Sequence, residues 1–291
     1  MSRFAAKILA GCLFAFTLAA IPAAVHAQLP ASPRRWVDNL DERCYSISAP
    51  APNVALRLDH LNPLFVQMGL PFENVTLLSP QQFCTPVKKN TIAPPADTLP
   101  FIQALDWECY GISGPALNIP LTLTQLNPVM SGLFGSTVSV TVQEPQLLCV
   151  PVAKTTTNPP PNVLALIQYI DVKCYRVSTS VNMTKTLTLT HLNPLFSTLS
   201  AEVSSIGPTP QQLCVPVTKN QAVIPTTVVQ YVQYSDVLCY PATGASLSRN
   251  LTLRHLNPVL AGLAPQTSFV GNSLKLCVPV AKNGMLPPGI Q

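Results

Sequence analysis

Charged residues are scarce in this chain of 291 residues, in which Asp, Glu, Lys and Arg together make up 10%. The formal net charge is +5 at pH 7, and no basic cluster is longer than a pair of residues. A nucleic-acid-binding protein needs a basic patch that neutralises phosphates. The sequence therefore predicts no nucleic-acid partner and a surface of Thr, Ser, Gln and Asn rather than charge.

Long apolar runs are also lacking after residue 27, because Pro and Thr interrupt each of them. A membrane helix needs about 18–20 apolar residues in a row, so we expect no transmembrane segment there. The start of the chain differs: Arg3 and Lys7 precede an apolar stretch over 8–25, and Ala-Val-His-Ala follows at 24–27. This pattern predicts a secretory signal peptide over residues 1–27. Its removal takes away Arg3 and Lys7 and lowers the formal charge from +5 to +3.

A signal peptide implies an exported protein, either secreted, periplasmic or at the cell surface. Cys12 lies within Leu9-Ala10-Gly11-Cys12, which resembles a lipoprotein box. Lipidation of Cys12 is therefore an alternative to cleavage after Ala27, and mass spectrometry of the mature N-terminus would distinguish the two.

Eight cysteines remain after the predicted signal peptide, and they recur with a period of 65 residues. They are Cys44, Cys84, Cys109, Cys149, Cys174, Cys214, Cys239 and Cys277. The gaps between them are 40, 25, 40, 25, 40, 25 and 38 residues. We therefore divide the mature chain into unit 1 (28–91), unit 2 (92–156), unit 3 (157–221) and unit 4 (222–291), each with one cysteine pair.

Four other residues recur in register with the cysteines. An Asp stands three residues before the first cysteine of a unit and a Tyr follows it; an Asn lies in a Leu-Asn-Pro motif, and a Lys stands five residues after the second cysteine. These residues are Asp41, Asp106, Asp171 and Asp236; Tyr45, Tyr110, Tyr175 and Tyr240; Asn62, Asn127, Asn193 and Asn257; Lys89, Lys154, Lys219 and Lys282. We interpret all of them as structural framework.

The sequence of each unit predicts mostly β-strands. Strands are expected over 171–177, over the alternating segments 56–59, 121–124, 187–190 and 251–254, and over 137–142 and 147–152. Asn-Pro suits the start of a short helix, as at 194–199. The Pro after the second cysteine suggests a sheet edge. The fold class predicted is all-β, mostly antiparallel with short helical turns, as four tandem disulfide-stapled units; the alternative is a closed, four-bladed propeller-like arrangement.

Pairing within each unit uses every thiol: Cys44 with Cys84, Cys109 with Cys149, Cys174 with Cys214, and Cys239 with Cys277. Pairing across the joints leaves Cys44 and Cys277 without partners unless the chain closes into a ring, so we favour pairing within units. A unit of 65 residues is marginally stable alone. A disulfide that closes about 40 residues adds roughly 3–4 kcal/mol by loop entropy.

Antiparallel pairing of the two cysteine strands also brings Asp106 and Lys154 to the same end of the strand pair, which predicts a surface Asp–Lys pair in every unit.

The sequence gives little support for a catalytic site or a metal site. His60, His191 and His255 precede Leu-Asn-Pro, but Gln125 takes this place in unit 2, and an amide cannot act as a general base or replace the metal ligand. A capping or strand-end hydrogen bond explains the position better. The carboxylates Asp59, Glu73, Glu144 and Glu202 share no phase of the repeat. No CxxC, HxxxH, nucleophile elbow, P-loop or GxGxxG occurs, so we expect no metal and no cofactor.

The motifs Cys-Tyr, Leu-x-Leu before a turn, and Leu-Cys-x-Pro-Val-x-Lys-Asn together resemble a bacterial exported tandem-repeat family of unknown function. The resemblance covers all four units, from Asp38 to Gly284. The chain differs at Thr85, Val150, Val215 and Val278, where the family has Asn, and it has Leu-Asn-Pro in place of Asp-Gln-Phe, as a divergent member would. The resemblance implies export and a β-rich unit, and it implies no activity.

Two functions follow as hypotheses. The first is a non-enzymatic binding or structural module, whose partner is a protein or a cell-surface or extracellular polymer, because repetition suits binding better than a single asymmetric active site. The alternative is a hydrolase of extracellular polymers that uses carboxylates not identified by any motif. We favour the non-enzymatic function.

Overall fold

The computed structural model of the chain describes residues 29–154 and 158–290. The predicted signal peptide, including Cys12, lies outside the described residues, and so does the boundary between units 2 and 3. None of the helices in the described ranges is long and apolar enough to cross a membrane.

Two strands in each unit carry the cysteines. Those with the first cysteine are β1 (Glu42–Ser48), β5 (Asp106–Gly111), β8 (Val172–Ser178) and β12 (Val237–Pro241). Those with the second are β4 (Pro80–Lys89), β7 (Thr137–Lys154), β11 (Gln212–Lys219) and β14 (Gln266–Lys282). Between them run β2 (Ala55–His60), β3 (Glu73–Thr76), β6 (Ile119–Gln125), β9 (Lys185–His191), β10 (Glu202–Ile206) and β13 (Arg249–His255).

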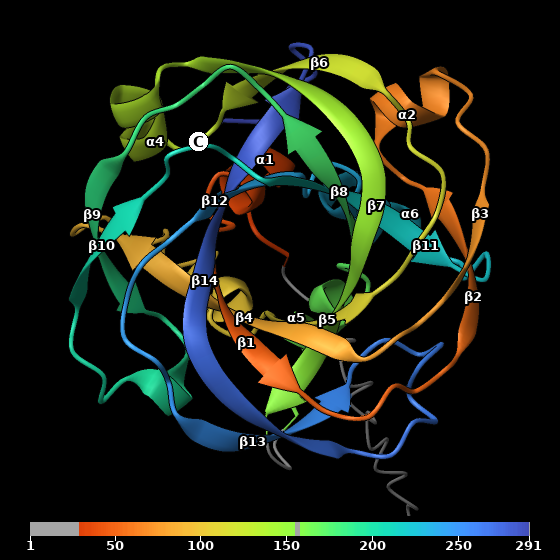
Figure 1. The fold of residues 1–291 in the computed structure, drawn as a ribbon. Coiled ribbons are helices and arrows are strands. Elements are labelled where there is room, and N and C mark those ends of the chain that lie inside the picture. The colour runs from red at the N-terminus through yellow and green to blue at the C-terminus, as the bar shows by residue number, and fades with distance from the viewer. Residues whose placement is uncertain (1–28, 155–157, 291) are drawn as a thin grey trace, which may run out of the picture.

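The cysteine strands form a closed ring in the order β1, β4, β5, β7, β8, β11, β12, β14 and back to β1, with antiparallel pairing throughout (Figure 1). The predicted fold class is confirmed, because the structure is mostly antiparallel sheet with short helices and four regularly spaced disulfides. The first and last units meet through β1 and β14, so the ring has no free edge between them.

The remaining strands form hairpins outside the ring, and each hairpin extends the sheet of the unit two places away. β2 pairs with β11 and β9 with β4, which joins units 1 and 3. β6 pairs with β14 and β13 with β7, which joins units 2 and 4. The strands of one unit therefore do not make a separate blade, and the four units share one continuous sheet of 14 strands.

The Pro after each second cysteine was expected at a sheet edge, but it lies inside the sheet. It stands where the strand exchanges one neighbour for another: β4 leaves β5 after Cys84 and joins β9 at Val87, with Pro86 between. A residue at such a junction needs no N–H donor on that side. The Pro86 carbonyl accepts a hydrogen bond from Leu192 N at 2.9 Å, and the other three prolines bond the equivalent leucines.

Units 1 and 3 resemble each other, and units 2 and 4 do likewise. In unit 2 the expected strands over 137–142 and 147–152 are one strand of 18 residues, β7, and in unit 4 β14 has 17 residues. In units 1 and 3 loops divide the corresponding segment into β3 and β4, and into β10 and β11. The molecule therefore has a two-fold alternation that the cysteine spacing does not reveal.

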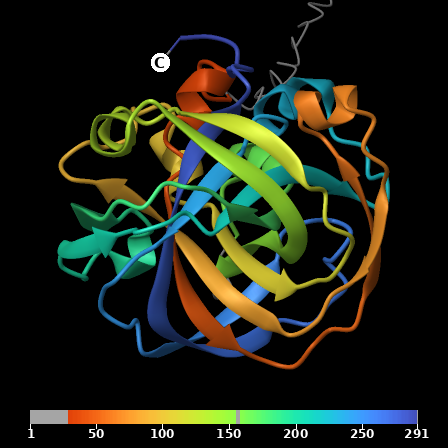
Figure 2. The ribbon, with the colours of Figure 1, turned by 45° about the horizontal axis from the view of Figure 1, so that its top comes forward.

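Short helices precede the first cysteine strands: α1 (Pro33–Val37), α3 (Leu99–Ile102), α5 (Pro161–Ile167) and α6 (Thr226–Val232). Their buried residues join all eight cysteines in one inner core, and α1, α5 and α6 lie inside the outline of the ring in Figure 1. Beside α1 runs the C-terminal segment (Figure 2), where Arg34 N donates to Pro288 O at 3.0 Å. Three further apolar clusters fill the space between ring and hairpins.

The Asn-Pro helices are α2 (Pro63–Gln67), α4 (Pro128–Phe134) and the 3-10 turn η1 (Pro194–Phe196). The expected Asn caps are present: Asn193 Oδ1 accepts a hydrogen bond from Leu195 N at 3.0 Å, and Asn62, Asn127 and Asn257 make the same contact.

Candidate functional site

The predicted disulfides form within the units, joining Cys44 to Cys84, Cys109 to Cys149, Cys174 to Cys214, and Cys239 to Cys277. Alternation along the strands places the cysteines on the inner face of the ring and the following tyrosines on the outer face. Each of the eight cysteines in the described residues is at most 4% exposed. The disulfides thus lie in the centre of the inner core.

The predicted Asp–Lys pair is present in every unit, but it is buried instead of exposed. Lys154 Nζ contacts Asp106 Oδ1, and the other pairs are Asp41 with Lys89, Asp171 with Lys219, and Asp236 with Lys282. Burial raises the pKa of each of these aspartates and lowers that of each lysine, while the partner charge opposes the shift. Removing one partner of such a pair leaves an uncompensated buried charge, so breaking it costs far more than breaking a surface pair.

The repeated Asn completes each Asp–Lys pair from the next unit. Asn193 Nδ2 donates to Asp106 Oδ2 at 2.9 Å and to the Gln103 carbonyl at 3.1 Å. Asn257 and Asp171 lie 2.6 Å apart in the same arrangement, and Asn127 lies 3.4 Å from Asp41. The same side chain therefore begins a helical turn in its own unit and binds the carboxylate of the preceding unit.

The repeated Tyr and the His before Leu-Asn-Pro meet across the molecule. Tyr45 Oη lies 3.0 Å from His191 Nε2, Tyr110 Oη lies 3.1 Å from His255 Nε2, and Tyr175 contacts His60 at 3.3 Å. In the fourth contact Gln125 Nε2 donates to Tyr240 Oη at 2.8 Å. Each pair joins units two places apart. The Tyr rings are buried, and each hydroxyl is hydrogen-bonded to the side chain from the opposite unit, which agrees with a structural role for the repeated Tyr.

Burial lowers the pKa of His60, His191 and His255 to about 4, and nearby cations, such as Lys219 beside His255, add to the effect. The imidazoles are therefore neutral at pH 7, and Gln125 can replace one of them because only hydrogen bonding is required. This supports the strand-end hydrogen bond predicted for the position.

The Asn after the repeated Lys, which the sequence shows only as part of the Lys-Asn motif, has a structural role of its own. Asn90, Asn220 and Asn283 have left-handed backbones, with φ of 52°, 50° and 46°. Asn283 Oδ1 accepts from Thr122 N at 2.9 Å, and its own N–H donates to Thr122 O at 2.7 Å. Asn90 and Asn220 hold the opposite hairpins in the same way. The recurrence of the Lys-Asn dipeptide is the sequence feature that could have indicated this role.

The carboxylates outside the repeat phase do not form an acid–base pair. Each of the four contacts a cation: Asp59 with Arg57, Glu73 with Lys173, Glu144 with Arg176, and Glu202 with Arg43. Glu108 has a pKa raised to about 7 by burial, but it is 1% exposed. Across residues 29–154 and 158–290 no group of three or more His, Cys, Asp or Glu side chains is arranged to hold a metal ion.

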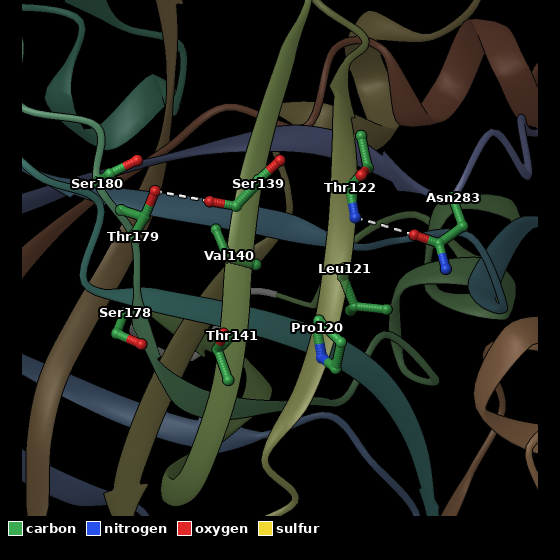
Figure 3. Close-up of a pocket in the computed structure, with 10 residues that line it drawn as sticks. All are labelled: Pro120, Leu121, Thr122, Ser139, Val140, Thr141, Ser178, Thr179, Ser180 and Asn283. Atoms are coloured by element: carbon green, nitrogen blue, oxygen red, sulfur yellow. Dashed lines mark hydrogen bonds between the residues drawn. The ribbon is translucent and has the colours of Figure 1, made fainter.

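One surface depression is a groove over the hairpin of β6 and the first part of β7, with a volume of about 760 Å3 (Figure 3). Thr122 and Asn283 lie on one side of it, and Ser178, Thr179 and Ser180 on the other. Thr179 Oγ1 donates to the Ser139 carbonyl at 2.6 Å. No charged side chain lines this hydroxyl groove, which leaves hydroxyl and amide groups as its means of recognition.

A second hollow of about 500 Å3 lies at the joint between units 2 and 3. Its walls are apolar and include Pro100, Pro159, Pro160 and Leu195, while Asp106 and Lys154 also reach it. Lys154 and Asn158 border residues 155–157, which lie outside the described residues. We therefore take the hydroxyl groove as the candidate site.

Comparison with known proteins finds no matching family model, no matching curated protein and no matching solved structure. The resemblance to the bacterial exported tandem-repeat family stays a prediction.

Proposed function

We propose that the chain is a non-enzymatic binding protein of the exported compartment, and that it binds an uncharged extracellular or cell-surface polymer through the hydroxyl groove. One observation carries the proposal: the ionisable residues that recur in the repeat are held in buried pairs, whereas the hydroxyl groove is lined by hydroxyl and amide groups and by no charged side chain. Neutral hydrogen-bonding groups suit a polysaccharide better than an anionic or cationic ligand.

Export is supported by the four disulfides, because such bonds persist in oxidising compartments. The secreted, periplasmic or surface location and the signal peptide over 1–27 are part of this proposal. So is membership of a divergent branch of the exported repeat family.

Binding of soluble neutral polysaccharides, measured by affinity electrophoresis or calorimetry, tests the proposal. Thr122→Val and Thr141→Val should each weaken binding several-fold, because each removes one hydroxyl from the groove. Thr252→Val is the matched control, since Thr252 has the equivalent place in the hairpin of unit 4 and lies outside the groove. Equal binding by all variants, or no binding by the unaltered protein, would overturn the proposed site.

The alternative function, hydrolysis of an extracellular polymer, is examined with the same samples by assaying reducing ends and free amines. Turnover that disappears on replacement of a single carboxylate, such as Glu144→Gln, would replace binding by catalysis as the function.

A further inference from the structure

The eight cysteine sulfurs form one closed belt inside the ring. Each sulfur is bonded to its partner in the same unit and also lies close to a sulfur of the neighbouring unit. These second contacts are Cys84–Cys109 and Cys44–Cys277 at 3.9 Å, and Cys149–Cys174 and Cys214–Cys239 at 3.8 Å. Because β1 pairs with β14, the belt has no end.

We propose that this belt is an internal thiol–disulfide exchange circuit, in which a thiol at one cysteine passes from unit to unit around the ring. In each step the thiolate attacks the sulfur that it touches across the joint. A disulfide forms across the joint, the disulfide within the neighbouring unit breaks, and its other cysteine leaves as a thiolate. The proton lost by the attacking thiol is taken up by the departing sulfur, so the step involves no net oxidation.

In the intact protein the circuit starts when local opening of the inner core lets an external dithiol reduce one disulfide, and the dithiol is itself oxidised to a disulfide. After that step no further reagent is required. The cysteines are at most 4% exposed and lie among the apolar residues of the inner core, so a neighbouring sulfur is more accessible to a new thiol than any molecule in solution.

The closed ring allows a second, shifted pairing that still uses all eight cysteines. The observed bonds span 40, 40, 40 and 38 residues. The shifted bonds would span 25, 25, 25 and 233 residues. Loop entropy depends on the logarithm of loop length, so one very long loop offsets three shorter ones and neither pairing is strongly preferred by chain entropy.

The circuit is tested with Cys277→Ser in a Cys12→Ser background, which leaves Cys239 as the single starting thiol. The Cys239 thiolate attacks Cys214 and frees Cys174. Cys174 then attacks Cys149 and frees Cys109, and Cys109 attacks Cys84 and frees Cys44. After incubation at pH 8, acid quenching, alkylation and peptide mapping should find the label on Cys239, Cys174, Cys109 and Cys44, together with Cys214–Cys239, Cys149–Cys174 and Cys84–Cys109 disulfides. Label on Cys239 alone would overturn the proposal.

A broken circuit is the matched control. Adding Cys109→Ser and Cys149→Ser removes the disulfide of unit 2, so the thiol can pass from Cys239 to Cys174 and no further. Label on Cys44 or Cys84 in this variant would indicate scrambling through unfolding or between molecules and would overturn the circuit. Near-ultraviolet circular dichroism verifies that each variant is folded.

Partial reduction of the unaltered disulfide belt gives a test that needs no belt variant to fold. The protein is treated under native conditions with less than one equivalent of dithiothreitol, quenched and mapped. Disulfides across the joints, including Cys44–Cys277, are expected among the partly reduced molecules. Detection of only the four original disulfides and their free thiols would contradict the proposal.

Discussion

Asn62 Nδ2 lies 2.6 Å from Asp236 Oδ2, so a side chain from the first unit binds a carboxylate of the last. The contact repeats at the other three joints with the same residue types. The chain therefore closes on itself with the contact that links its successive units, and the closure should be as strong as any other joint.

Replacement of these asparagines tests that equivalence. Asn62→Ala and Asn193→Ala should each destabilise the protein by about 1–3 kcal/mol, because each removes a helix cap and leaves a buried carboxylate with one donor fewer. The free energy of unfolding is measured in urea with the disulfides intact. A loss for Asn193→Ala with none for Asn62→Ala would contradict equal joints.

The buried Asp106–Lys154 pair should behave as a coupled unit. Lys154→Met leaves a buried carboxylate without its cation and should cost about 3–5 kcal/mol. Adding Asp106→Leu should restore part of that loss, because the double variant buries no unpaired charge. The comparison is a double-mutant cycle in urea. Effects that simply add would reject the coupling.

The neutral state of His255 predicts a pH dependence of stability. Its pKa is about 4 in the folded protein and about 6.5 when unfolded. The unfolded chain then binds the proton more readily, so stability is complete above pH 6.5 and falls as the pH drops towards 4, by about 2–3 kcal/mol.

His255→Gln should remove this loss, because Gln125 makes the equivalent contact with Tyr240 without titrating. Urea titrations at pH 7 and pH 4.5 measure the difference. An unchanged pH dependence in the variant would contradict the assignment, and Tyr169→Phe, at a position with no part in the Tyr–His contacts, serves as control.

Glu42 should have the opposite pH dependence. Its carboxyl is buried without a hydrogen bond to any described residue, at a position where the other units have Trp107, Val172 and Val237. Burial, together with Asp106, holds its pKa well above its usual range. The folded state then binds the proton more readily, so its contribution to stability is present below about pH 4.5 and is lost as the pH rises through the folded pKa.

Glu42→Val, which copies units 3 and 4, should therefore stabilise the protein by about 1–3 kcal/mol at pH 7. The gain should shrink towards pH 4. Thermal and urea unfolding at both pH values measure it, and Glu42→Gln separates the effect of charge from that of packing. A variant less stable than the parent at pH 7 would show that the carboxyl has a stabilising partner.

Local features of the fold could be predicted from the residues themselves. The alternation in Leu187-Thr188-Leu189-Thr190 predicts a half-buried strand, and Asn193-Pro194 predicts the start of a helical turn, because both depend on neighbours in the chain. The Asp106–Lys154 contact followed from antiparallel pairing of two disulfide-linked strands. The burial of this pair could not be predicted, because the side chains that cover it, Phe83 and Phe196, come from other units.

The sequence by itself determined the repeated unit, its strands, its cysteine pair and the residues that hold each strand end. Only the tertiary structure decided that the ring closes, that each hairpin joins the unit two places away, and that units alternate in two kinds. The physical reason is that every unit carries the same Tyr, Asn and hairpin pattern. By sequence alone, Tyr110 could therefore bond the residue before Leu-Asn-Pro in any unit. His255 is selected by the geometry of the closed ring, which no local pattern contains.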